Sequence, residues 1–139
     1  MATIRKEFPV EASAEQVWDA IRDVGEVARR VSPGFLTDSR MDGDARIVHF
    51  ANGLTAREVI VSIDDQARRF AYGVAGTTLT HHNASFEVVP DGPARCRVVW
   101  LADLLPDDAG PRVAGMMEQG GAAMQRTLSQ GDGRGRACR

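Results

Sequence analysis

Four side chains in the middle of the sequence carry the functional groups of acid–base chemistry. Glu58 has a carboxylate that can act as a general base or accept hydrogen bonds, and His82 has an imidazole that exchanges protons near neutral pH. Arg46 stays charged at any physiological pH, so its guanidinium suits a carboxylate or an enolate, and the Tyr72 phenol could steady the same negative oxygen. These four residues are our candidate catalytic residues.

Each of these residues also has a structural interpretation, which the sequence leaves open. Glu58 could be a structural carboxylate paired with Arg46 or with water, and Arg46 could form a salt bridge at a rim. His82, together with His81, could begin an exposed strand end. If Glu58, Tyr72 and His82 lie level on neighbouring strands, the outer two are about 10 Å apart across two strand spacings. They would then flank a ligand and would not form a direct dyad.

Other kinds of site lack the residue spacings that they require. The three histidines form no HExxH pair and the two cysteines, Cys96 and Cys138, are not paired in a metal motif, so we expect no metal site. The glycines between 110 and 121 do not follow a strand, and no GxSxG motif occurs. Neither cysteine has an evident base partner. We therefore expect no phosphate-binding loop, no serine or cysteine nucleophile and no cofactor.

Length, composition and charge exclude further classes of protein. A chain of 139 residues with 43% hydrophobic residues suits one domain, and no window approaches the roughly 20 continuous apolar residues of a membrane span. The formal net charge of -2 gives no electrostatic footprint for nucleic acid. The opening residues MATIRKEF lack the features of a signal peptide, so we expect a cytoplasmic protein, as a monomer or a homodimer.

The elements that would position the candidate residues begin with a strand and two helices. Apolar and polar residues alternate over residues 3–10, which predicts a half-buried strand. Ser13, with Gln16 three positions later, forms a capping box that opens a helix over residues 14–24. A second short helix follows and ends at Pro33-Gly34.

Strands then dominate from residue 34 to residue 103. Six strand segments are separated by turn signals, so the pattern predicts an antiparallel meander of hairpins; the signals are Asp42-Gly43, Asn52-Gly53, Asp64-Asp65, Gly76 and Asp91-Gly92-Pro93. Helical spacing predicts a long last helix over residues 109–130. We expect one domain over residues 1–130 and a disordered tail over residues 131–139.

This order of elements, with residues along its whole length, resembles the START/Bet v 1-like (SRPBCC) superfamily, and within it the polyketide cyclase/dehydrase and lipid-transport family. The residues that carry the resemblance, which covers positions 2 to about 130, are PVEASAEQVWDAI (9–21), Arg46, Asn52-Gly53-Leu54, Glu58, Ile63-Asp64-Asp65, Arg68-Arg69, Tyr72 and Val99-Trp100. The resemblance implies an α+β helix-grip fold. Such a fold has a seven-stranded curved antiparallel sheet around a long C-terminal helix, with two short helices between strands one and two.

Residues 46–72 also resemble the plant abscisic acid receptors of the same superfamily. Their gate loop reads Ser-Gly-Leu-Pro-Ala, and the counterpart here is Asn52-Gly53-Leu54-Thr55-Ala56, without the proline. Their His-Arg-Leu latch is replaced by Thr77-Thr78-Leu79. These differences argue against hormone sensing, while a movable lid at residues 52–56 remains an expectation.

The resemblance also implies an internal cavity between the concave face of the sheet and the long helix. Strand alternation assigns the four candidate catalytic residues to this cavity. It adds as ligand-binding residues Val48, Phe50, Ile60, Phe70, Ala84, Phe86 and Trp100. Leu54, within the expected lid, and Met117 and Met124, on the last helix, complete the predicted ligand-binding residues. By the same alternation Val59, Val61 and Ile63 face solvent, although a β-bulge would reverse the assignment beyond it.

Two functions fit such a cavity. The first is binding of a small hydrophobic or aromatic metabolite, polyketide-like or lipid-like. The second is an aromatase/cyclase-type enzyme, in which Glu58 or His82 removes a proton next to a carbonyl and Arg46 or Tyr72 stabilises the enolate during aldol cyclisation and dehydration. A weaker third interpretation is a structural or interaction module, for example a dimer through an exposed edge of the sheet, with Val59, Val61 and Ile63 as a candidate partner surface.

Overall fold

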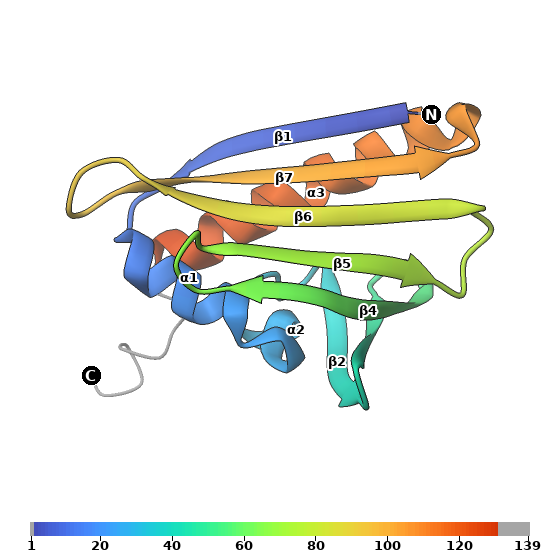
Figure 1. Ribbon diagram of the computed structural model, residues 1–139, viewed down its shortest axis with the longest axis horizontal. Coiled ribbons are helices and arrows are strands. Elements are labelled where there is room, and N and C mark those ends of the chain that lie inside the picture. The colour runs from blue at the N-terminus through green and yellow to red at the C-terminus, as the bar shows by residue number, and fades with distance from the viewer. Residues whose placement is uncertain (1, 131–139) are drawn as a thin grey trace.

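A curved antiparallel sheet wraps around one long helix in the structure, a computed structural model that describes residues 2–130 (Figure 1). Neighbouring strands are antiparallel throughout, in the order β1-β7-β6-β5-β4-β3-β2. The strands are β1 (Ala2–Val10), β2 (Leu36–Asp42), β3 (Ala45–Phe50), β4 (Thr55–Asp64), β5 (Arg69–Ala75), β6 (His81–Pro90) and β7 (Cys96–Leu105). The predicted helix-grip fold is confirmed, and the predicted tail over residues 131–139 lies outside the described residues.

Two short helices, α1 (Ala14–Arg22) and α2 (Val27–Arg30), connect β1 to β2, with one 3-10 turn (Val24–Glu26) between them. The predicted capping box is present. The Ser13 hydroxyl accepts a hydrogen bond from the Gln16 backbone N–H, and the Gln16 side chain accepts one from the Ser13 backbone N–H. The helix therefore begins where the sequence predicted and ends two residues earlier.

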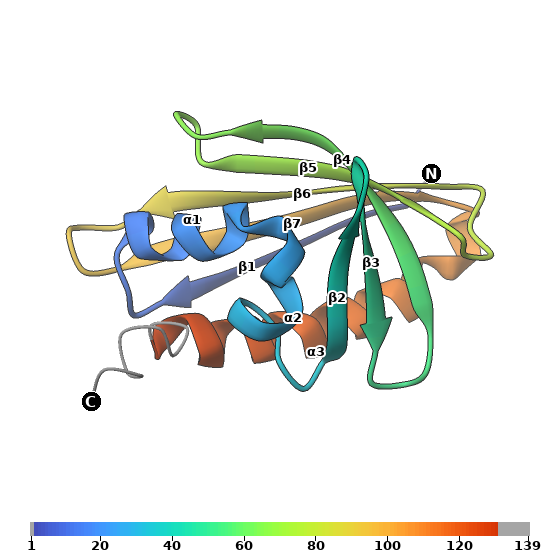
Figure 2. The ribbon, with the colours of Figure 1, turned by 90° about the horizontal axis from the view of Figure 1, so that it is seen from below.

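The long helix α3 (Gly110–Ser129) crosses the concave side of the sheet and packs along β1 (Figure 2). A 3-10 turn at Asp107–Ala109 joins it to β7. Its buried side chains recur at the predicted helical spacing; among them are Val113, Met117, Met124 and Leu128. No helix within residues 2–130 has the length and hydropathy that a membrane span would require.

A β-bulge in β4 corrects one part of the predicted alternation. The pairing of β4 with β5 shifts between Ile60, which lies opposite Tyr72, and Ser62, so Val61 is the additional residue. Beyond the bulge Ile63 lies opposite Phe70 and therefore on the concave side, not on the outer face as predicted. Val61 itself is 66% exposed, as expected of an outward residue.

Two glycines of α3 should respond in opposite ways to alanine. A Cβ at Gly120 would lie 2.9 Å from Phe35 Cε2 and 3.1 Å from Trp100 Cζ3, whereas a Cβ at Gly115 would meet nothing within 4 Å. Gly120→Ala is therefore expected to destabilise the protein by about 1–3 kcal/mol through overpacking. Gly115→Ala should stabilise it by about 0.5–1 kcal/mol, because alanine is the better helix former. Urea denaturation of both variants tests this, and equal shifts would show that the close approach at Gly120 does not matter.

Candidate functional site

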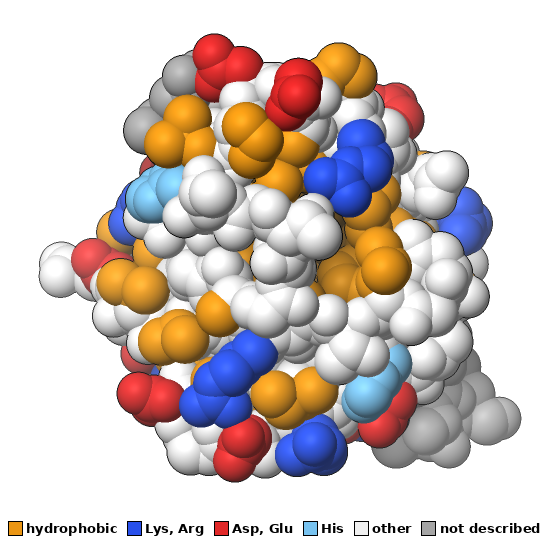
Figure 3. Space-filling view, turned by 90° about the vertical axis from the view of Figure 1, so that its right-hand side faces the viewer, with side chains coloured by type: hydrophobic (Ala, Val, Ile, Leu, Met, Phe, Trp, Pro, Cys, Tyr) orange, Lys and Arg blue, Asp and Glu red, His pale blue; other side chains and the backbone are white. Residues whose placement is uncertain are grey.

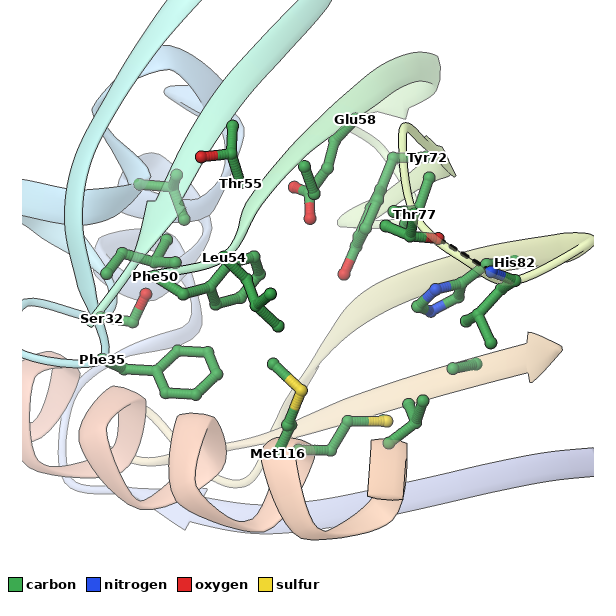
Figure 4. A pocket seen from close by; sticks show the side chains of 18 of the residues that line it. Ser32, Phe35, Phe50, Leu54, Thr55, Glu58, Tyr72, Thr77, His82 and Met116 are labelled. Carbon is green, nitrogen blue, oxygen red and sulfur yellow. Dashed lines mark hydrogen bonds between the residues drawn. The ribbon is translucent and has the colours of Figure 1, made fainter. Parts of the chain in front are cut away.

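A cavity of about 460 Å³ lies between the concave face of the sheet and α3 (Figure 4). Glu58 and Tyr72 point into it from the sheet, and Met116 faces them from the helix. Ser32 and His82 lie at opposite sides of the view. Most of the other lining residues are apolar; they include Val27, Leu36, Phe50, Val74, Phe86, Trp100, Ala102, Val113, Met117 and Met124. The site is a mostly apolar chamber with a few polar groups.

The cavity opens at one end of the molecule, the end that Figure 3 faces. Its exposed lining residues come from three neighbouring segments: the β3–β4 loop with the first residue of β4, the β5–β6 loop, and the first turn of α3. These residues are Leu54, Thr55, Gly76, Thr77, Thr78 and Arg112, which we call the mouth. Figure 3 shows hydrophobic side chains exposed between polar ones at this end.

Arg46 and Glu58 form a buried ion pair on the cavity wall. They lie directly opposite each other on β3 and β4, and Arg46 Nε donates to Glu58 Oε1 at 2.7 Å. Their side chains are only 3% and 10% exposed. Arg46 also donates from Nη1 to the Val24 carbonyl oxygen at 3.1 Å. Glu58 is therefore paired with Arg46, as the structural interpretation expected. The second carboxylate oxygen of Glu58 takes no part in this hydrogen bond.

Aromatic rings on three adjacent strands form a stack beside the ion pair. Ring centroids are 5.2 Å apart for Phe70 and Tyr72, 6.1 Å for Tyr72 and Phe86, and 5.0 Å for Phe86 and Trp100. The Arg46 guanidinium lies 5.0 Å from the Phe70 centroid and 5.2 Å from that of Tyr72, within the range of cation–π attraction. Neighbouring rings of the stack are inclined to each other by 23°, 19° and 18°, so they are nearly parallel.

The Tyr72 hydroxyl is fixed at the edge of this stack. Trp100 Nε1 donates to its oxygen at 3.1 Å, so the phenolic hydrogen is available to a further acceptor. Burial raises the pKa of Tyr72 strongly, and the negative charge of Glu58 adds to the effect. Tyr72 is therefore neutral at physiological pH, and its hydroxyl can donate a hydrogen bond.

His82 lines the cavity and is not an exposed strand end. Its Nδ1 is buried, with no hydrogen-bond partner in the described part of the chain. Gly73 pairs with Asn83 and Glu58 pairs with Val74, so Val74 lies between Glu58 and His82. Tyr72 lies opposite Ile60 and therefore not level with Glu58. The distance across two strand spacings, about 10 Å, still leaves room for a ligand between Glu58 and His82.

Ser32 supplies a second buried polar atom without a partner. The residue is 0% exposed and follows α2, and its Oγ makes no hydrogen bond within residues 2–130 although it lines the cavity. Phe35 lies beside it and packs edge-to-face on Phe50, with ring centroids 5.5 Å apart. This aromatic pair and Ser32 line the part of the chamber beside Gly120 of α3.

Comparison with known proteins places the chain in a family. Residues 1–131 match the family model described as polyketide cyclase/dehydrase and lipid transport. The chain belongs to this family. No curated protein matches the sequence significantly.

Solved structures agree with membership of the polyketide cyclase/dehydrase and lipid-transport family at the level of fold. An uncharacterised protein from Bacillus thuringiensis is 20% identical, with a TM-score of 0.82 over 91% of this chain and 98% of that one. Norcoclaurine synthase from Thalictrum flavum, in complex with dopamine and hydroxybenzaldehyde, is 16% identical, with a TM-score of 0.70 over 93% and 87%. A START superfamily protein from Mycobacterium smegmatis is 14% identical, with a TM-score of 0.69 over 92% and 94%. These likenesses show that the chain shares the fold of these proteins.

Ten of the fourteen site residues predicted from the sequence line the cavity of this family member. The four candidate catalytic residues are among them, with Phe50, Leu54, Phe86, Trp100, Met117 and Met124. The other four do not line the cavity but lie on the concave side; they are Val48, Ile60, Phe70 and Ala84. Sequence reasoning missed several lining residues outside the strands, notably Ser32, Phe35 and Arg112. These residues lie outside the strands, so strand alternation could not assign them to the cavity.

The environment of His82 predicts a dependence of stability on pH. Burial, and to a lesser extent the neighbouring His81, lowers the pKa of His82 below 6.5 in the folded protein. An unfolded chain binds the proton first as pH falls, so this contribution to stability is present above pH 6.5 and is lost as pH falls toward the folded-state pKa. Urea denaturation between neutral pH and about pH 5 should show a shallower loss of stability for His82→Gln than for the unsubstituted protein. An equal loss would mean that His82 is hydrated.

Proposed function

We propose that the protein binds a small hydrophobic or aromatic metabolite, polyketide-like or lipid-like, inside the cavity. The observation that carries this proposal is the apolar chamber of about 460 Å³ with two buried polar atoms, Ser32 Oγ and His82 Nδ1, that have no partner in the described chain. Such a volume is typical of small-molecule sites. A buried polar atom without a partner costs free energy, which a ligand hydroxyl or carbonyl would recover.

The wall of the chamber favours flat or flexible apolar ligands. The stacked rings of Tyr72, Phe86 and Trp100 offer an aromatic surface, and Met116, Met117 and Met124 can adapt to different shapes. Norcoclaurine synthase has the same fold, and its structure is a complex with dopamine and hydroxybenzaldehyde. Both compounds are aromatic, which supports an aromatic ligand here. We therefore place the ligand body against the stack, with polar groups at Tyr72, Ser32 or His82.

Mass spectrometry of small molecules released from the purified protein tests the proposal. Protein incubated with a metabolite extract is washed, denatured and analysed, beside a variant whose chamber is filled by Val74→Trp. We expect apolar, oxygen-bearing compounds with the unsubstituted protein and a strong depletion in the filled variant. Recovery of the same compounds from both proteins would contradict binding in the cavity.

A second candidate function is catalysis of aldol cyclisation and dehydration. The observation that favours it is the available hydrogen of the Tyr72 hydroxyl in the same chamber as two possible bases, Glu58 and neutral His82. The base would take a proton from carbon next to a carbonyl, and Tyr72 would donate to the enolate oxygen. The carbon would then attack a second carbonyl of the substrate, which closes the ring, and the protonated base would return its proton to the new alkoxide. Removal of a second proton from the carbon next to the first carbonyl, with loss of that hydroxyl as water, would then form the carbon–carbon double bond. Arg46 holds Glu58 in place in this scheme.

Turnover measurements separate an enzyme from a binding protein. Compounds recovered by mass spectrometry, and their uncyclised precursors, are incubated with the protein, with Glu58→Gln and with His82→Ala, each checked for folding. An enzyme should lose product formation in at least one variant while binding stays within about threefold. Unchanged turnover in both variants would remove these residues from the mechanism.

A further inference from the structure

Arg112 differs from the other charged groups of the cavity because it lies at the mouth. Among the charged residues that line the cavity, Arg46 and Glu58 are buried, whereas Arg112 is exposed. Arg112 lies in the first turn of α3, and no ion pair to it occurs within residues 2–130. Asp108, four residues earlier, is also exposed and makes no ion pair with it there. The guanidinium is therefore available to a ligand that fills the chamber.

The interior cannot take an anionic group as readily as the mouth. The charge of Arg46 is already matched by Glu58 at 2.7 Å, and Val24 accepts a further hydrogen bond from the same guanidinium. His82 is neutral at pH 7, because burial lowers its pKa. A carboxylate placed inside would lose its hydration and would face Glu58 without a free cation. At the mouth it would stay hydrated and could pair with Arg112.

Arg112 and Ser32 lie at different places along α3. Phe35, beside Ser32, packs against Gly120, which lies eight residues after Arg112 on the same helix. Eight residues of α-helix span about 12 Å. A ligand with its apolar body along α3 can therefore place one end beside Arg112 and the other near Ser32.

We infer that the cavity takes amphipathic carboxylates, with the apolar body inside and the carboxylate paired with Arg112 at the mouth. This inference rests on the proposed function, and it adds the charge and the orientation of the ligand. Ligands with a cationic end are disfavoured, because they would place like charge beside Arg112. Neutral ligands of the same shape bind, but more weakly than the carboxylate.

Decanoate and 1-decanol form a matched pair of probes, because they share an apolar chain and differ in charge. Isothermal titration calorimetry is carried out with the unsubstituted protein, Arg112→Gln, Arg112→Lys and Arg40→Gln. Arg40 is exposed and does not line the cavity. Arg40→Gln removes the same charge as Arg112→Gln, so it controls for the electrostatic field of the whole protein. We expect Arg112→Gln to weaken decanoate about tenfold and to leave 1-decanol within about twofold. Arg112→Lys should keep most of the preference, and Arg40→Gln all of it.

The outcomes distinguish the inference from the function on which it rests. If neither probe binds the unsubstituted protein, the proposed function fails and the inference fails with it. If both bind and the preference for decanoate is missing, or survives in Arg112→Gln, binding in the cavity stands and the role of Arg112 is overturned. Added salt should reduce the preference for decanoate, because the pair at the mouth is exposed to solvent.

Discussion

Replacing Glu58 with leucine is expected to lower the free energy of unfolding by about 3–5 kcal/mol, because it leaves the Arg46 charge buried without its partner. Arg46 is only 3% exposed, and beyond Glu58 it contacts one backbone carbonyl and the faces of two aromatic rings. Since a domain of this size is stable by only about 5–15 kcal/mol, the loss should be large. Urea denaturation gives the free energy of unfolding of each variant.

Two further variants show whether the effect comes from the buried charge. The double variant Arg46→Met with Glu58→Leu removes both charges and should recover most of the lost stability. Asp42→Asn breaks the exposed pair of Arg57 with Asp42, whose side chains are 40% and 57% exposed, and should cost at most about 1 kcal/mol. A single variant Glu58→Leu as stable as Asp42→Asn would mean that Arg46 reaches water through the cavity.

Filling the chamber with Val74→Trp is expected to weaken binding of 1-decanol by roughly ten- to a hundredfold. Val74 lies between Glu58 and His82 and lines the cavity, so the indole would occupy space that the ligand body needs. A ligand could then enter only by pushing the indole into the cavity wall. Such overpacking typically costs about 1–3 kcal/mol. Calorimetry measures the change in dissociation constant.

The control adds the same bulk to the opposite face of the sheet. Val59 is half-buried on β4 and lies opposite Gly73, and it does not line the cavity. Val59→Trp should therefore leave the affinity within about twofold. Equal losses in both variants would show that binding takes place elsewhere or that the substitutions disturb the sheet.

The fold could be predicted from the sequence because local signals agreed along the chain. Turn dipeptides such as Asn52-Gly53 lie where hairpins close, and Gly53 adopts a φ of +93°, a conformation that glycine favours. Alternation with a period of two also placed Arg46, Glu58, Tyr72 and His82 on one face, because strand side chains alternate strictly where no bulge intervenes. The face of each strand was thus encoded locally.

The extent of the cavity could not be predicted, because it depends on where α3 crosses the sheet. Phe70 and Val48 lie on the correct face, yet Phe70 is 0% exposed and stacks on Tyr72 away from the chamber. The bulge after Ile60 reversed the alternation at Ile63, and no residue type marks such a bulge. Ser32 and Arg112 reach the site only through the tertiary arrangement of a loop and a helix start.

The stacked rings give the protein an optical reporter of its own. Trp100 ends the stack and lines the chamber, whereas Trp18 donates its Nε1 hydrogen bond to Asp65 at 2.9 Å, away from the lining. A guest that contacts the Trp100 indole should change its fluorescence emission, while that of Trp18 stays constant. A protein with Trp18→Phe would then follow occupancy through a single natural fluorophore, without any attached dye.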